Sequence, residues 1–212
     1  MIPWQLHEFK IAPGQRERFL ALWRTRLMPL ADRHGPCIAG CWTEGDDRFI
    51  WLSSCAIHGT DDALAEEWPA MLGRHRGLGT MDVSCILSEP DFSPLGARIQ
   101  QAKPPLEHRL YELAEERLKP GGEEAANLAR EMIVPLARDV GLDLIGVWTS
   151  PATSQSSERV IWMTGFADEP ERQAKQAAFQ ADPRFAVLTS QMETPARSRV
   201  LEPCDFSPLG PA

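Results

Sequence analysis

Histidine is the residue type in this sequence that is best suited to proton transfer, and its distribution along the chain is uneven. His7, His34, His58 and His75 occur early in the chain, and only His108 follows. An imidazole changes charge near neutral pH and can act as a general base or a general acid. His7 falls within a strand-like run and His75 at the end of a helix-like run. We therefore interpret His7 and His75 as the candidate catalytic residues.

Each histidine also has a structural interpretation. His7 could be a buried, hydrogen-bonded strand residue, and His75 a surface residue favoured by the dipole at a helix C-terminus. His34 precedes Gly35 and is typical of a helix C-terminal cap. His58 looks like a loop residue.

The sequence lacks the patterns that are typical of several other kinds of site. The five cysteines show neither CxxC nor CxxxH spacing, so we expect reduced thiols and no metal. No glycine-rich phosphate loop, GxSxG or HExxH pattern occurs. A haem would need an axial histidine, for which His7, His58 and His75 are the candidates. We expect no cofactor and keep haem as a third possibility.

Charge and hydropathy exclude several kinds of partner. The 212 residues carry a net charge of −8, whereas nucleic-acid binding needs clustered Lys and Arg. No apolar run reaches the length of about 18 residues that a membrane helix requires. The N-terminal residues lack the pattern of a signal peptide. We expect a cytoplasmic protein that binds neither nucleic acid nor membrane.

The chain is an internal duplication. Asp-Phe-Ser-Pro-Leu-Gly occurs at 91–96 and again at 205–210. Three longer segments also align between the halves, and their insertions fall in loops. These pairs are WQLHEFKIAPG (4–14) with YELAEERLKPG (111–121), MPLADRHGPCIAGCWT (28–43) with VPLARDVGLDLIGVWT (134–149), and RFIWLSS (48–54) with RVIWMTG (159–165).

Each repeat is expected to form the elements β-α-β-β-α-β. In repeat one, strand patterns cover residues 4–11, 37–43, 48–57 and 82–88, with helices at 15–34 and 60–76. Pro29 and its duplicate Pro135 predict a kink in the first helix of each repeat. This order is the ferredoxin-like arrangement, whose sheet leaves one apolar face to be covered.

The fold class is therefore α+β, with two ferredoxin-like repeats packed sheet to sheet as a pseudo-dimeric α+β barrel. We assign residues 1–96 to repeat one, 97–107 to a linker and 108–212 to repeat two. The two Phe-Ser-Pro tails are expected to lap over the opposite repeat and clasp it.

Aromatic side chains are the candidates for a binding-site wall, because small-molecule sites are mostly apolar. Trp4 and Trp23 have no tryptophan at the duplicate position. Trp42 and Trp51 are duplicated, which also fits plain core packing. Tyr111 replaces Trp4 in repeat two and could orient a ligand there. The candidate substrate-binding residues are thus Trp4, Trp23, Trp42, Trp51 and Tyr111.

The second repeat resembles the NIPSNAP family of dimeric α+β barrel proteins. The resemblance rests on YELAEERLKPG (111–121), PLARDVGLDLIGVWT (135–149), RVIWM (159–163) and QADPRF (180–185). Repeat one departs from it, with Trp4 for the opening Tyr and GRHRG (73–77) for the ADPRF-type ending. The resemblance implies the fold far more strongly than an activity. Relatives in the superfamily include cofactor-free monooxygenases, muconolactone-isomerase-like proteins, haem enzymes and polyketide cyclases, which use histidines at positions similar to His7 and His75.

Two functions remain open. The first is a small-molecule-binding protein of secondary metabolism, acting on an apolar or aromatic metabolite in a repeat-one cavity as a cofactor-independent cyclase, isomerase or monooxygenase. The second is a non-catalytic binding or assembly module. The chain is expected to be a monomeric pseudo-dimer or a homo-oligomer.

Overall fold

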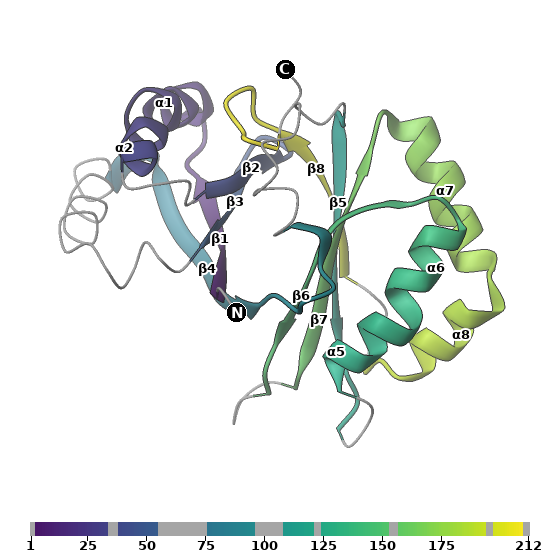
Figure 1. Cartoon of the computed structure of the whole chain (residues 1–212). Helices are drawn as coiled ribbons and strands as arrows, with labels where there is room; N and C mark the ends of the chain where they lie inside the picture. The colour runs from purple at the N-terminus through teal and green to yellow at the C-terminus, as the bar shows by residue number, and fades with distance from the viewer. Residues whose placement is uncertain are drawn as a thin grey trace. The chain divides into compact units, whose positions relative to one another are not determined.

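The structure is a computed structural model that describes residues 3–33, 38–54, 76–95, 108–120, 124–152, 157–193 and 197–209. The chain divides into two compact units (Figure 1). The repeat-one unit comprises Ile2–Leu87 and Glu202–Ala212, and the repeat-two unit comprises Ser88–Leu201. The proposed linker and the second helix of repeat one lie outside the described residues.

The hydrogen-bonded strand order confirms the α+β fold class. Repeat one contributes β1 (Pro3–Ile11), β2 (Ile38–Glu44), β3 (Arg48–Ser54) and β4 (Gly79–Ser88). Repeat two contributes β5 (Leu110–Arg117), β6 (Asp143–Ser150), β7 (Arg159–Phe166) and β8 (Arg197–Pro203). The strands follow the order β1-β3-β2-β8-β5-β7-β6-β4 in a closed barrel. Each repeat therefore has the ferredoxin-like neighbours, with its first strand between its third and its fourth.

The first helix of each repeat contains a π-helical turn. In repeat one, α1 (Arg16–Leu22) leads into the π-turn Trp23–Leu27 and then α2 (Met28–Arg33). In repeat two, α5 (Ala125–Leu128) leads into Ala129–Ile133 and then α6 (Val134–Asp139). Pro29 and Pro135 follow these turns, and proline lacks the N–H that a regular α-helix needs. The predicted irregularity is therefore present in both copies, as a π-turn.

Repeat two continues with two helices where the sequence predicted one. The predicted helix is α7 (Glu169–Ala181), capped by the Asp168 carboxylate, which accepts from the Glu171 N–H. Asp182 then caps α8 (Pro183–Ser190) in the same way. The short 3-10 turn Arg76–Leu78 precedes β4 in repeat one.

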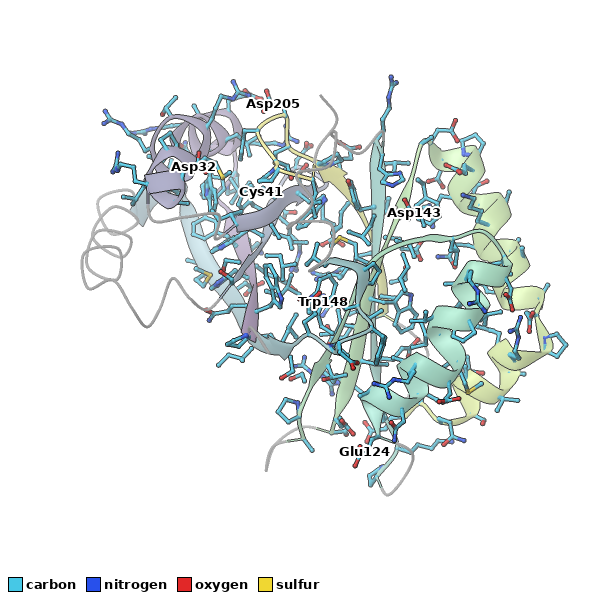
Figure 2. The ribbon with its side chains drawn as sticks, in the orientation of Figure 1. Asp32, Cys41, Glu124, Asp143, Trp148 and Asp205 are labelled. Carbon is cyan, nitrogen blue, oxygen red and sulfur yellow. The ribbon has the colours of Figure 1, made fainter. Side chains whose placement is uncertain are left out.

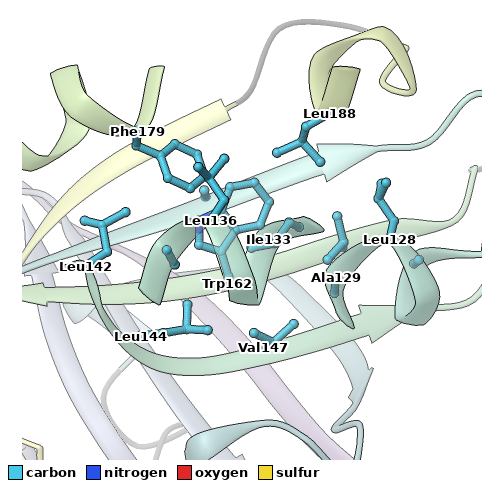
Figure 3. Close-up of a cluster of buried hydrophobic side chains, with 14 of the residues drawn as sticks. Leu128, Ala129, Ile133, Leu136, Leu142, Leu144, Val147, Trp162, Phe179 and Leu188 are labelled. Atoms are coloured by element: carbon cyan, nitrogen blue, oxygen red, sulfur yellow. The ribbon is translucent and has the colours of Figure 1, made fainter. Parts of the chain in front are cut away.

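Each unit has its own hydrophobic core on the helix-facing side of its sheet. The repeat-two core joins β5, β6 and β7 to the helices around Trp162 (Figure 3). The repeat-one core is richer in aromatic rings. Its members include Phe9, Phe19, Trp23, Phe49 and Trp51.

The two tails lie on the opposite repeats, as the repeated motif predicted. The tail of repeat two packs in the repeat-one unit, where the Ser207 hydroxyl accepts from the Cys41 N–H at 2.9 Å. Figure 2 labels Cys41 and, from this tail, Asp205. The tail of repeat one packs in the repeat-two unit, where Ser93 accepts from the Val147 N–H at 3.1 Å. Ser93 and Ser207 are duplicates, and so are Cys41 and Val147. The same clasp is therefore built twice.

An arginine of each π-turn completes the clasp. Arg24 pairs with Asp205 and lies 5.9 Å from the centre of the Phe206 ring. Arg130 pairs with Asp91 at 2.9 Å and lies 5.0 Å from the Phe92 ring. Because both arginines occupy the same position in the duplicated π-turns, the turn and the tail form one repeated structural device.

Candidate functional site

His7 lies in the helix-facing side of the repeat-one sheet and is held from two directions. Strands β1 and β3 pair antiparallel, with His7 opposite Trp51. The two rings stack with centroids 4.4 Å apart and planes 10° from parallel. The imidazole Nε2 is 3.2 Å from the Ser53 hydroxyl oxygen. With only 6% of its surface exposed, His7 is a fixed, buried imidazole.

A continuous set of aromatic rings extends from His7 into the core. Trp23 belongs to the π-turn, and its ring centroid lies 4.9 Å from that of Trp51 and 4.5 Å from that of Phe49. Phe49 contacts Phe19 edge-on at 5.1 Å. The π-turn thus places its first residue, Trp23, against the strand that carries Trp51.

The predicted binding-site residues of repeat one lie on opposite faces of its sheet. His7, Trp23 and Trp51 share the helix-facing side. Trp4 is an odd number of residues from His7 along β1, so it faces the opposite side, because side chains alternate along a strand. Trp42 pairs with Ile50, the neighbour of Trp51, and also lies on that opposite side.

Two other predicted residues are not part of this group. His75 lies outside the described residues, so its place beside His7 stays a prediction. Tyr111 belongs to the repeat-two unit, where its ring is fully buried on β5.

Repeat two lacks the chemistry of this group at the duplicate positions. Ala114 stands in the place of His7, and Ala129 in the place of Trp23. Only Trp162 keeps the aromatic ring of its duplicate, Trp51. The polar group and its aromatic surroundings are therefore specific to repeat one.

Glu116 is a buried acidic residue that the sequence analysis missed. It is 3% exposed, and its Oε2 has no hydrogen-bond partner among the residues that the structure describes. Burial raises the pKa of Glu116 to about 7. Its neighbours on the same strand face are Ala114 and Leu118, both members of the repeat-two core. A glutamate between two core positions of an alternating strand was the available signal.

A second buried carboxylate of repeat two is paired. Glu112 accepts from Arg172 of α7 at 2.8 Å and from the Ser198 hydroxyl. Arg172 also bonds Glu169, and these hydrogen bonds lower the pKa of Glu169 to about 2. These bonds hold α7 against the sheet, so we assign Glu112 a structural role.

The repeat-one group can support acid–base chemistry on an apolar ligand. The Ser53 hydroxyl and the stack on Trp51 fix the orientation of the imidazole, as a general base requires. Within the part of the chain that the structure describes, no three His, Cys, Asp or Glu side chains are placed to hold a metal ion. None of the described helices combines the length and hydropathy needed to span a bilayer.

Comparison with known proteins identifies the fold, and one family model matches part of the chain. The NIPSNAP family model matches residues 107–208, which is the second repeat. No curated protein matches the chain. A NIPSNAP family protein from Agrobacterium tumefaciens is 27% identical over 50% of this chain and 96% of its own, with a TM-score of 0.42.

Two solved structures are similar over both repeats. A proposed monooxygenase from Lactobacillus acidophilus is 9% identical, with 99% of this chain and 98% of that chain covered and a TM-score of 0.59. A chlorite dismutase variant from Candidatus Nitrospira defluvii is 8% identical, with 95% and 92% covered and a TM-score of 0.58. These likenesses show the α+β barrel fold of the chain.

Proposed function

We propose that this chain is a tandem NIPSNAP-like protein that binds a small aromatic or apolar molecule beside His7, and that His7 exchanges a proton with it. The proposal rests on the buried imidazole of His7, which stacks on Trp51 and contacts Ser53. It lies at the end of the continuous set of aromatic rings described above. Aromatic rings bind flat apolar molecules, and the imidazole supplies one polar contact. The reaction class we favour is cofactor-independent proton transfer, as in a cyclase, isomerase or monooxygenase.

Two further points support the proposal. The family match covers repeat two, and the residue-by-residue alignment of the halves extends the likeness to repeat one. The ring set around His7 is absent from repeat two, so it is not needed to build the fold. A group that one copy keeps beyond the needs of folding is a candidate for function.

The alternative is a non-catalytic binding or assembly module. The contacts of His7 give it some support, since Ser53 already satisfies Nε2 and Trp51 already covers one ring face. In that case His7 would stabilise the core and take no part in binding.

Calorimetric titration with a matched pair of probes distinguishes the proton-exchanging site from the non-catalytic module. The probe 1-naphthol offers a hydroxyl to His7, whereas 1-methoxynaphthalene has the same rings without the proton. His7→Phe keeps a ring on Trp51 and removes the nitrogen. We expect this variant to bind 1-naphthol about fivefold more weakly, the value of one hydrogen bond. Its affinity for 1-methoxynaphthalene should stay the same.

The outcome that refutes proton exchange is equal loss, or no loss, for both probes. Absence of binding by the native protein refutes the small-molecule site itself. Unfolding of His7→Phe is checked by circular dichroism, and His7→Gln, whose amide oxygen can accept from the naphthol hydroxyl, should then retain part of the affinity.

A further inference from the structure

We infer that repeat two holds a second acid–base site, independent of His7, in which His108 is a general base oriented by Asp143. The imidazole Nε2 lies 2.7 Å from the Asp143 Oδ2. The His108 side chain is 16% exposed and that of Asp143 38% exposed. The pair is thus partly buried and reaches solvent, unlike a core ion pair.

The partner of Nε2 determines which nitrogen is the base. An ionised carboxylate only accepts hydrogen bonds, so Nε2 carries the proton and donates it to Asp143. In the neutral imidazole, Nδ1 then holds the free lone pair. Among the described residues, none hydrogen-bonds to Nδ1. This is the arrangement of an imidazole base backed by an orienting carboxylate.

Gly165 leaves room for the imidazole ring of His108 against the strand. A Cβ at this position would lie 2.4 Å from Cδ2 of His108, closer than any real contact. Gly165 does not have a positive φ, so its backbone would accept another residue. The glycine is therefore needed for the close approach of His108 to the strand.

The strand register places the other two groups beside this position. Gly165 pairs with Tyr111 on one side and with Asp143 on the other. Directly paired residues share a sheet face. His108 thus lies over Gly165 between these two side chains, with its ring edge-on to Tyr111 at 5.8 Å.

The duplication shows that the fold does not require this group. The positions that correspond to His108, Asp143, Gly165 and Tyr111 in repeat one hold Met1, Cys37, Ser54 and Trp4. No base, carboxylate or glycine is kept there. All four residues of the group therefore occur together only in repeat two.

The ligand class follows from the base. A small molecule with an acidic C–H beside a carbonyl, or with an acidic hydroxyl, would lose its proton to Nδ1. The electron pair of the broken bond stays on the ligand as an enolate or phenolate. The imidazolium that forms keeps its Nε2–H bond to Asp143, whose negative charge stabilises it.

Base-catalysed ring opening of 5-nitrobenzisoxazole tests the site on the full chain. Its C3 proton moves to Nδ1, the C–H electron pair completes the nitrile, and the N–O bond breaks to release 2-cyano-4-nitrophenolate, which is coloured. We expect turnover above that of free imidazole at the same concentration. His108→Gln should lower the rate roughly 100-fold, the lower end of the usual effect of a positioned base.

Two positioning variants separate a base from a structural ion pair. Asp143→Asn should lower kcat and leave KM unchanged, because the imidazolium that forms during proton transfer loses its counter-charge. Gly165→Ala should also lose turnover, because its Cβ displaces the ring. Gly77→Ala is the matched control, since a Cβ there meets none of the described atoms within 4 Å; it should keep the native rate.

Three results would overturn the proposal. These are no turnover beyond free imidazole, a native rate in folded His108→Gln, and an Nδ1-protonated neutral ring in long-range ¹H–¹⁵N correlation spectra. The spectra are recorded on the native protein, so they decide the tautomer even where a variant fails to fold.

Discussion

Glu116 is a carboxyl among hydrophobic side chains, and the pH dependence of repeat two should reveal it. Its pKa is raised from 4.5 in the unfolded chain to about 7 in the fold. Below the lower value both states are protonated, and the carboxyl does not oppose folding. Between the two values only the unfolded state ionises, so stability falls as pH rises.

Replacement of Glu116 by Gln should remove this dependence. The free energy of unfolding of the native protein, relative to Glu116→Gln, should fall by about 3 kcal/mol between pH 4.5 and values above 7. Urea unfolding of both proteins over this range measures the difference, in which the effects of all other groups cancel. A constant difference would show that Glu116 ionises as an exposed carboxyl does.

The sequence predicted residue types more successfully than residue neighbours. It singled out His7 and Trp51 as candidate residues, but their stacking depends on the register of β1 against β3. His108 and Asp143 are 35 residues apart, and the registers of three strands bring them together. No local pattern encodes such registers, so this pair could not be foreseen.

At the scale of elements, the predicted strands of both repeats are confirmed and the helix details are not. Proline and turn signals located the hairpins and the irregular part of each first helix. The π-turns were missed because a kink prediction does not specify its hydrogen-bond pattern. Helix α8 was missed although Asp182 and Pro183 are an N-cap and a first-turn proline.

In each repeat a strand glycine lies against a tryptophan side chain, Gly40 against Trp42 and Gly146 against Trp148. Alanine should be poorly tolerated at both glycines. A Cβ at Gly40 would lie 2.3 Å from Cη2 of Trp42, and at Gly146 it would lie 2.6 Å from Cη2 of Trp148. Both indoles are buried, so they cannot move away without repacking the core. Each substitution should cost about 1–3 kcal/mol of stability, the usual effect of overpacking.

Thermal unfolding of Gly40→Ala and Gly146→Ala measures this cost. The exposed Gly77→Ala serves as the control and should unfold at the native temperature within error. If all three variants behave alike, the indoles do not restrict these positions.

At the scale of the whole molecule, each tail stabilises the repeat that it does not follow in sequence. Removal of residues 204–212 takes away the Ser207 hydroxyl, the bond from the Cys204 N–H to the Cys41 carbonyl, and the buried Leu209. We expect a loss of about 3–5 kcal/mol from the repeat-one unit, from one leucine and two hydrogen bonds.

Hydrogen exchange followed by mass spectrometry shows where the loss falls. The Cys41 amide should lose protection in the truncated chain, whereas the Val147 amide keeps its bond to Ser93. Ser207→Ala is the milder variant and should affect the same amide. Equal loss at Cys41 and Val147 would mean that the two clasps are not independent.

The exchange of tails also has a consequence for protein concentration. If each repeat were a separate chain, docking of its tail would need a second molecule and would weaken on dilution. Within one chain the same docking is intramolecular, with an effective concentration set by the connection between the repeats. The fused gene product therefore keeps both clasps at any dilution, whereas a chain cut between residues 96 and 108 would hold them only above a threshold concentration.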